Sequence, residues 1–182
     1  MKTPFSIYAV LLAMTMSCAS SKSSATLSEI AKLDDIVTSK TFKIESIWAM
    51  PQVTNSLASL QNSGLIAPGN SINRMNISGI SNHLTVSQDS ISSRLPYYGE
   101  VQMPSGYNGS DDNSITFDGL VTDYKAVKNK DNSYTITFDA KSNNENFNVT
   151  ILMYTSLQTE MILNGAKRFS IRYSGELIEI EK

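Results

Sequence analysis

The chain has 182 residues, of which 41% are hydrophobic and 18% are charged, and its formal net charge is −2. This length and composition are typical of one globular domain with a sizeable hydrophobic core. The slightly acidic balance, with positive charges scattered rather than gathered in runs, argues against nucleic acid as a partner.

The N-terminal segment has the organisation of a secretory signal peptide. Lys2 provides a positive charge, and the run FSIYAVLLAMTM follows at positions 5–16 with two polar interruptions. A membrane-spanning helix needs about 20 apolar residues, whereas this run has the length of the hydrophobic region of a signal peptide. We therefore predict that residues 1–17 are a signal peptide and that the chain is exported.

Cys18 directly follows this segment and is the only cysteine in the chain, so it cannot form an intramolecular disulfide. The order of residues in MTMSCASSKS is similar to a bacterial lipoprotein signal, in which the sulfur of the cysteine carries a diacylglycerol. Several acyl chains give stable membrane anchoring. We predict lipidation of Cys18, with residues 18–25 including a flexible tether. The alternative is an ordinary secretory signal followed by an unmodified cysteine.

A helix is predicted over residues 27–39. Thr26 and Glu29 fit a capping box, in which a hydroxyl and a carboxylate close opposite backbone donors. Apolar residues recur behind this start at roughly helical spacing. The predicted stripe consists of Leu27, Ile30, Ala31 and Leu33.

Strands are predicted for most of the remaining chain. The run FKIESIWAM alternates between apolar and polar residues until Pro51 stops it. Residues 52–70 contain a short helix or turn. From position 72 onward, short alternating runs such as SYTITFDAKS are separated by the polar turns KNKDNS, SNNEN and NGAK. Strands joined by such short turns are antiparallel neighbours.

The last run, RFSIRYSGELIEIE, contains a change of phase. Tyr173 and Leu177 share one face, but the apolar residues then shift to Ile178 and Ile180. A one-residue slip exchanges the two faces of a strand. We therefore predict a β-bulge near Gly175.

Together these elements predict a mainly β fold. About seven strands in sequence form a meander, which closes or curls to protect its edges. The expected architecture is a curved antiparallel meander sheet or small barrel, lipocalin-like in outline, with an N-terminal helix that covers one end or face. Residues 26–182 are expected to form a single β-rich domain.

Several segments carry a resemblance to a known family. They are VTSKTFKIESIWAMP, LTVSQDSISSRLPYYGE, ITFDGLVTDYKAV, YTITFDA and RFSIRYSGEL, and the most specific piece is LPYYG at 95–99. Over residues 36–178 the chain resembles the secreted Bacteroidetes proteins called domain of unknown function 4251. It departs from them in extra residues at 52–69 and in lacking a clear glycine turn near Gln158. The resemblance implies a lipoprotein signal and an envelope location, but no activity.

No catalytic or metal-binding constellation is evident. His83 is the only histidine, and one histidine cannot build a zinc site. Asp111 and Asp112 could offer oxygens to calcium, but their spacing differs from that of the calcium loop. The adjacent carboxylates of Asp34 and Asp35 diverge on a helix. We predict a non-enzymatic protein with no metal and no cofactor. A hydrolase that uses His83 is the least favoured alternative.

The stretch RLPYYGE, residues 94–100, places two large aromatic rings in polar surroundings. In the structural interpretation, Pro96 ends a strand, Leu95 points into the core, and one tyrosine packs inward with its hydroxyl bonded. In the binding interpretation, exposed rings and an arginine form a contact surface, where these residue types are favoured. That candidate binding surface consists of Arg94, Tyr97, Tyr98 and Tyr107. Both interpretations hold if one tyrosine ring packs into the core and the other belongs to the contact surface.

These features predict a cell-envelope lipoprotein that acts as a binding module for a small apolar ligand or an envelope partner. The alternative is a structural or accessory subunit of an envelope complex, which would have a filled core. The membrane is an expected partner through the lipid on Cys18. No acidic cluster follows this residue, which favours an outer-membrane anchor facing the periplasm. Without lipidation, the chain would be secreted into the periplasm.

Overall fold

The computed structural model describes residues 25–61, 63–103, 114–142, 145–178 and 180. This part of the chain contains two helices, α2 (Leu27–Ser39) and α3 (Asn55–Leu60), and neither is long and apolar enough to cross a membrane. The strands are β1 (Thr41–Pro51), β2 (Met75–Asn76), β3 (His83–Ser87), β4 (Ser90–Leu95), β5 (Ile115–Leu120), β6 (Thr122–Lys128), β7 (Tyr134–Ser142), β8 (Glu145–Met153), β9 (Gln158–Gly165) and β10 (Ile171–Ile178).

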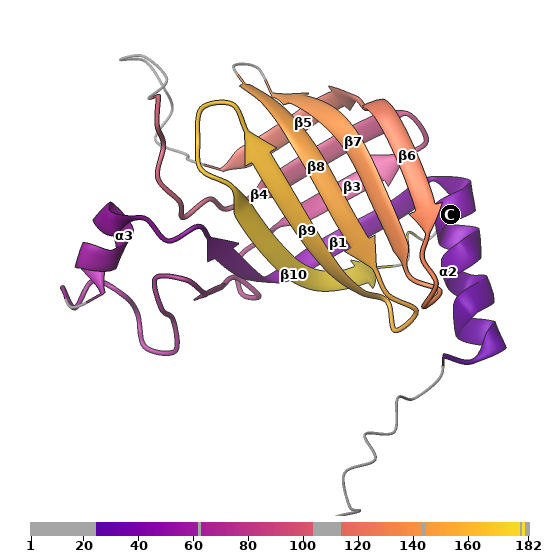
Figure 1. Cartoon of the computed structure of the whole chain (residues 1–182), viewed down its shortest axis with the longest axis horizontal. Coiled ribbons are helices and arrows are strands. Elements are labelled where there is room, and N and C mark those ends of the chain that lie inside the picture. The colour runs from indigo at the N-terminus through magenta and orange to yellow at the C-terminus, as the bar shows by residue number, and fades with distance from the viewer. Residues whose placement is uncertain (1–24, 62, 104–113, 143–144, 179, 181–182) are drawn as a thin grey trace, which may run out of the picture.

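The strands form one curved antiparallel sheet in the order β5-β4-β3-β1-β10-β9-β8-β7-β6, and the short strand β2 pairs with β1 (Figure 1). The first strand and the last strand are hydrogen-bonded to each other. The sheet curls until β5 lies close to β7, so the fold is a nearly closed barrel. The predicted fold class, a curved antiparallel sheet or small barrel with an N-terminal helix, is confirmed.

The two edges of the curled sheet meet at a seam, and the strands that form these edges come from the middle of the chain. The two edge strands, β5 and β6, are separated in sequence only by Val121, which crosses from one edge to the other. The amide of Val121 donates to the carbonyl of Asp89 in the β3–β4 turn, at 2.9 Å. On β6, the ring of Tyr124 stacks against Phe138 of β7, with centroids 6.2 Å apart. Across the seam itself, where no strand pairing joins the edges, β5 lies against β7, and Phe117 of β5 packs against Phe147 of β8.

Helix α2 covers one end of the barrel (Figure 1). Both hydrogen bonds of the predicted capping box between Thr26 and Glu29 are present, and the helix has the predicted bounds. Its buried residues are Leu33 and Val37, whereas Leu27, which was expected on the buried stripe, is 86% exposed. Ala31 of the same predicted stripe is exposed as well, so full burial begins only at Leu33, almost two turns into the helix.

A polar contact also joins α2 to the barrel. Asp34 accepts hydrogen bonds from Lys128 Nζ at 2.7 and 2.8 Å and from the Tyr134 hydroxyl at 2.8 Å. These bonds lower the pKa of the Asp34 carboxyl below its usual value. The adjacent carboxylate of Asp35 is on another side of the helix, where it lines a groove.

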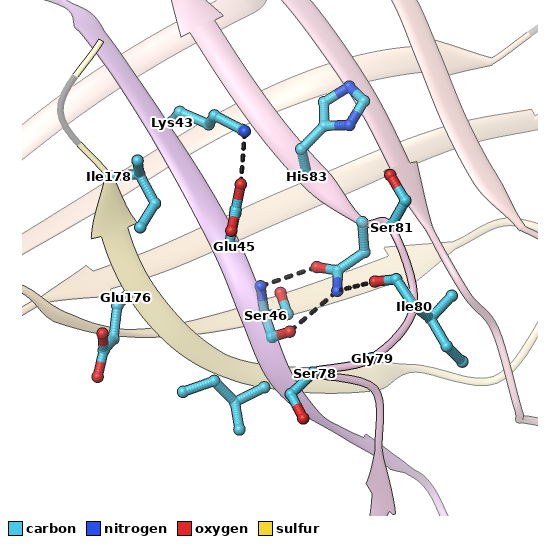
Figure 2. A pocket seen from close by; sticks show the side chains of 12 residues that line it. Lys43, Glu45, Ser46, Ser78, Gly79, Ile80, Ser81, His83, Glu176 and Ile178 are labelled. Carbon is cyan, nitrogen blue, oxygen red and sulfur yellow. Dashed lines mark hydrogen bonds and ion pairs between the residues drawn. The ribbon is translucent and has the colours of Figure 1, made fainter.

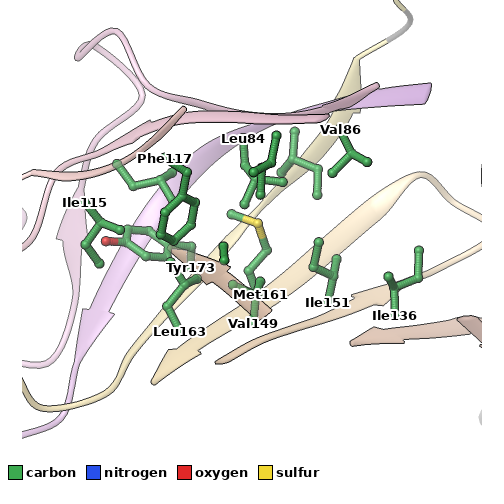
Figure 3. Packing of buried hydrophobic residues seen from close by; sticks show 14 of the residues in the cluster. Leu84, Val86, Ile115, Phe117, Ile136, Val149, Ile151, Met161, Leu163 and Tyr173 are labelled. Carbon is green, nitrogen blue, oxygen red and sulfur yellow. The ribbon is translucent and has the colours of Figure 1, made fainter. Parts of the chain in front are cut away.

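The inward side chains of the strands pack into one hydrophobic cluster. Side chains from the two halves of the curved sheet face each other across the interior, as Figure 3 shows for Phe117, Tyr173 and Met161. Phe117 and Phe147 meet edge to face, with ring centroids 5.2 Å apart. Tyr173 is fully buried and donates its hydroxyl to the carbonyl of Pro96 at 2.8 Å. The interior of the barrel is therefore packed with side chains along this cluster.

The bulge predicted near Gly175 lies on the partner strand. Ser46 pairs with Gly175 and Trp48 pairs with Ser174, so Ile47 of β1 is the extra residue. Strand β10 keeps its alternation, because Leu177 is buried while Ile178 points outward and is 38% exposed. The prediction of a face exchange in the last strand was therefore wrong. The apolar residues at its end are outward-facing.

Candidate functional site

An apolar groove runs between helix α2 and the barrel wall, and we call it the α2 groove. It has a volume of about 660 Å³ and is built from one side of α2, the start of β1, the turn before β9 and the end of β10. Its lining residues are Ser28, Ala31, Lys32, Asp35, Ile36, Thr41, Phe42, Leu157, Leu177, Ile178 and Ile180.

The floor and the wall of the α2 groove are both hydrophobic. Phe42 and Leu177 are buried members of the core cluster, so the groove reaches down to the core. Ile178 and Ile180 are 38% and 39% exposed and form part of its lining. Outward positions on a strand are usually polar, so Ile178 at the end of β10, together with Ile180 just beyond the strand, leaves apolar surface uncovered beside the groove.

Four polar residues complete the lining of the α2 groove. Ser28, Lys32 and Asp35 lie on α2, and Thr41 lies at the start of β1. An apolar surface with a few polar groups at its edge is the usual composition of a small-molecule site. This arrangement suits an amphiphile, whose apolar chain would lie along the floor and whose polar end would meet the edge.

A second groove follows the bulge of β1, and we call it the bulge groove (Figure 2). Its volume is about 340 Å³, and its lining includes Lys43 and Glu45 of β1, His83, and Glu176 and Ile178 of β10. Lys43 and Glu45 form an ion pair beside it. No group of three or more His, Cys, Asp or Glu side chains in the described ranges could hold a metal ion.

His83 has one hydroxyl neighbour. Its Nε2 atom lies 3.4 Å from Ser92 Oγ on the outer face of the sheet. Burial, together with the positive charges of Lys43 and Arg94, lowers the pKa of His83, and Glu45 opposes this shift. Nucleophilic catalysis by a serine also needs a group that orients the imidazole, and we find no carboxylate hydrogen-bonded to this ring within the described residues.

The LPYYG stretch forms a corner at the end of the barrel away from α2. Leu95 is fully buried, and Tyr97 is only 7% exposed. The Tyr97 hydroxyl donates to the carbonyls of Glu100 and Phe169, both at 2.9 Å. Burial raises the pKa of Tyr97 to about 12. The ring lies against Gly99, where an added Cβ would be 2.6 Å from its Cζ atom.

A buried ion pair supports this corner. Glu145, almost fully buried, accepts hydrogen bonds from Arg168 Nε at 2.9 Å and from the amide of Lys167 at 2.8 Å. The Arg168 guanidinium lies 4.7 Å from the ring centroid of Tyr97. Sequence reasoning missed this pair, because Glu145 belongs to the polar run SNNEN and gives no local signal of burial.

The structure does not gather the candidate binding surface into one described patch. Arg94 is exposed on the outer face of β4, paired with His83, whereas Tyr97 points into the core. Tyr98 is half-buried and packs against the core cluster. Tyr107 and the lipidation candidate Cys18 lie outside the described residues. Sequence reasoning also missed the α2 groove. Ile178 and Ile180 were the signal for this groove, but they were interpreted as a register slip.

The fold defines a class of protein, namely a nearly closed antiparallel barrel that is capped by an N-terminal helix and has an apolar groove beside that helix. The family model described as domain of unknown function (DUF4251) matches residues 25–177. The chain therefore belongs to the DUF4251 family, as the resemblance predicted.

Among the solved structures that share the fold is a DUF4251 family protein from Bacteroides eggerthii DSM 20697, which aligns with a TM-score of 0.54 and 14% identity over 83% of this chain and 87% of that chain. At this identity the similarity shows the fold alone. No curated protein matches the chain.

Proposed function

We propose that this chain is a non-enzymatic, lipid-anchored protein of the bacterial cell envelope that binds a small apolar ligand in the α2 groove. The observation that carries the proposal is the groove itself, which joins a buried floor of Phe42 and Leu177 to a wall of Ile178 and Ile180. Its volume of about 660 Å³ lies in the usual range of small-molecule sites, roughly 300–1,000 Å³.

The packed interior directs the proposal to this groove. In lipocalin-like proteins a ligand lies inside the barrel, but here the interior positions belong to one packed cluster of side chains. A ligand would therefore bind outside the barrel, where α2 and the end of β10 leave apolar surface uncovered. An acyl chain suits such a site because it needs no hydrogen bonds.

The location is proposed from the N-terminal sequence. A signal peptide at residues 1–17, Cys18 directly after it, and a small polar tether support an anchor in the outer membrane, facing the periplasm. Intact-mass measurement of the protein from bacterial membranes tests this part. A mass that fits a chain starting at acylated Cys18 supports the anchor. An unmodified cysteine would leave a secreted periplasmic protein.

The ligand-binding part is tested with dodecanoate and residues 19–182, which include every described residue. Calorimetric titration should show saturable binding, and the double variant Ile178→Ser/Ile180→Ser should bind at least about tenfold more weakly, since each isoleucine would lose on the order of 1 kcal/mol of apolar contact. Val127→Ser, an exposed residue of β6 outside the groove, is the matched control. Equal binding by the double variant, or no binding by the wild type, would refute the site.

A second candidate function is that of an accessory subunit in an envelope complex. The observations that favour it are the packed interior and the exposed apolar residues around α3, namely Val53, Leu60 and Leu65. Cross-linking in cells should then capture a partner, and Leu60→Ser/Leu65→Ser should remove that cross-link. Persistence of the same cross-link in this variant would exclude the α3 segment as the contact.

A further inference from the structure

We infer that the α2 groove is the docking site for one acyl chain of the lipid that Cys18 of the same molecule carries. The inference rests on the proposed lipidation and deepens the proposed function by naming the occupant. In this arrangement the groove shields that chain when no membrane is present. When a bilayer is present, the chain leaves the groove and inserts into the bilayer.

Cys18 lies close to the α2 groove along the chain. Ser28, the first groove residue in the chain, follows Cys18 by only ten positions. A segment of this length spans at most about 35 Å when it is fully extended. The sulfur of Cys18 therefore lies within reach of the groove by chain length alone.

The short connection between Cys18 and α2 raises the local concentration of the attached lipid at the groove. A ligand on a short flexible linker experiences an effective concentration in the millimolar range at a nearby site. A free amphiphile has to compete with this value. Among the possible occupants of the groove, a chain attached to Cys18 is therefore favoured even when its intrinsic affinity is modest.

The lining of the α2 groove matches the chemistry of a lipid attached at Cys18. The tether meets α2 at Leu27, and the first-turn residue Ser28 lies on the polar edge of the groove. The polar linkage between sulfur and acyl chain would enter at this edge. The acyl chain would continue between Ile36 on the helix and Leu177 and Ile180 on the barrel side, where the lining is aliphatic.

A bilayer competes with the α2 groove for the acyl chain. A bilayer surrounds an acyl chain on all sides, so each methylene group gains the full transfer free energy there. The α2 groove is open along its length, because Ile178 and Ile180 remain partly exposed, and so it covers the chain only in part. The acyl chain therefore partitions into the bilayer when a bilayer is present, and it stays in the groove when no bilayer is present.

The test uses residues 18–182 and the fact that Cys18 is the only cysteine, so a maleimide reacts at one site. One sample carries N-dodecylmaleimide and the other N-ethylmaleimide. Methyl NMR of isoleucines should show shifts at Ile36, Ile178 and Ile180 only in the dodecyl sample. These shifts should not change on tenfold dilution, because the contact is intramolecular. Shifts that vanish on dilution would mean association between molecules and would overturn the inference.

Competition gives a second readout. The dodecyl sample should bind free dodecanoate at least tenfold more weakly than the ethyl sample, and Ile178→Ser/Ile180→Ser should remove the shift at Ile36 while Val127→Ser keeps it. Circular dichroism confirms that both variants are folded. Adding phosphatidylethanolamine–phosphatidylglycerol vesicles should return the spectrum to that of the ethyl sample. Groove shifts that persist with vesicles would overturn the transfer to the membrane.

The outcomes separate the two proposals. If the ethyl sample binds free dodecanoate but the dodecyl chain leaves the isoleucine signals unchanged, the self-shielding inference is wrong and the ligand-binding proposal stands. If neither the free nor the attached chain perturbs the groove, both are wrong.

Discussion

The side-chain amide of Asn82 takes the place of a neighbouring strand beside Ser46. The Ser46 amide donates to Asn82 Oδ1 at 2.8 Å, and Asn82 Nδ2 donates to the Ser46 carbonyl at 3.0 Å. Strand β3 pairs with β1 only up to Ile44, and β2 begins its pairing at Trp48. Because a carboxamide has the donor and acceptor of a peptide unit, Asn82 continues the ladder across the bulge.

Replacing Asn82 with alanine should lower the free energy of unfolding by about 2–4 kcal/mol, since several buried backbone groups would lose their partners together. Its amide also donates to the carbonyls of Ile77 and Ile80. Urea unfolding followed by the fluorescence of Trp48, the only tryptophan, measures the change. Asn73→Ala, at an exposed position, is the control and should be close to neutral. A loss below about 0.5 kcal/mol for Asn82→Ala would show that water replaces the amide.

The two tyrosines of the corner should contribute unequally to stability. Tyr97→Ala removes a buried ring and should cost about 3–5 kcal/mol, whereas Tyr98→Ala removes a half-buried ring and should cost less than about 2 kcal/mol. Tyr97→Phe should cost about 1 kcal/mol, because only the hydroxyl bonds to Glu100 and Phe169 are lost. Chemical denaturation of the three variants measures these values. Equal large losses for both alanine variants would disprove the division of roles.

Gly175 should be intolerant of a side chain because of the bulge opposite it. A Cβ there would collide with the Glu45 carbonyl and lie 2.7 Å from Ser46 Cα, which are backbone atoms that cannot move aside cheaply. We expect Gly175→Ala to cost about 1–3 kcal/mol or more in unfolding free energy.

The matched control for this change is another strand glycine. A Cβ on Gly119 of β5 would meet nothing within 4 Å, so Gly119→Ala should be neutral or slightly stabilising. Thermal unfolding of both variants gives the comparison. Similar melting temperatures for the two variants would show that β1 can shift to relieve the collision.

Alkaline pH should destabilise the fold through its buried tyrosines. Burial raises the pKa of Tyr97 and of Tyr124 to about 12, and that of Tyr173 well above its usual value. An unfolded tyrosine titrates near pH 10. The unfolded state therefore loses these protons first, so the stability is fully present below about pH 10 and falls as the pH rises toward 12. Urea midpoints between pH 8 and pH 11.5 measure the slope.

Tyr124→Phe provides the check on this assignment. The Tyr124 hydroxyl is buried with no hydrogen-bond partner among the described residues, so its removal should not destabilise the protein at pH 7. The same variant should lose less stability than the wild type above pH 10. An unchanged alkaline slope would mean that Tyr124 already titrates normally in the folded protein.

Local patterns determined much of the fold in advance. The capping box at Thr26 and Glu29 and the following apolar residues placed α2 within its observed bounds. The alternation in YTITFDA placed β7, and the proline after Leu95 ended β4 with that leucine in the core. These features depend on backbone periods of 3.6 and 2.0 residues, which a short segment carries by itself.

Tertiary structure alone decided which strands meet. The pairing of β1 with β10 moved the bulge from the last strand to Ile47, because a two-to-one mismatch can be placed on either partner. The seam between β5 and β6, and the burial of Glu145 against Arg168, depend on segments far apart in the chain. Such contacts leave no periodic pattern in the sequence of a short segment.

The α2 groove shows both contributions. The sequence by itself determined that Ile178 and Ile180 follow a buried strand and that Cys18 precedes the helix by a short tether. Only the tertiary structure placed α2 across the barrel end, so that these isoleucines line a groove that starts at Ser28. The physical reason is that an apolar side chain gains free energy from whatever surface covers it, and which surface that is depends on the packing of the whole chain.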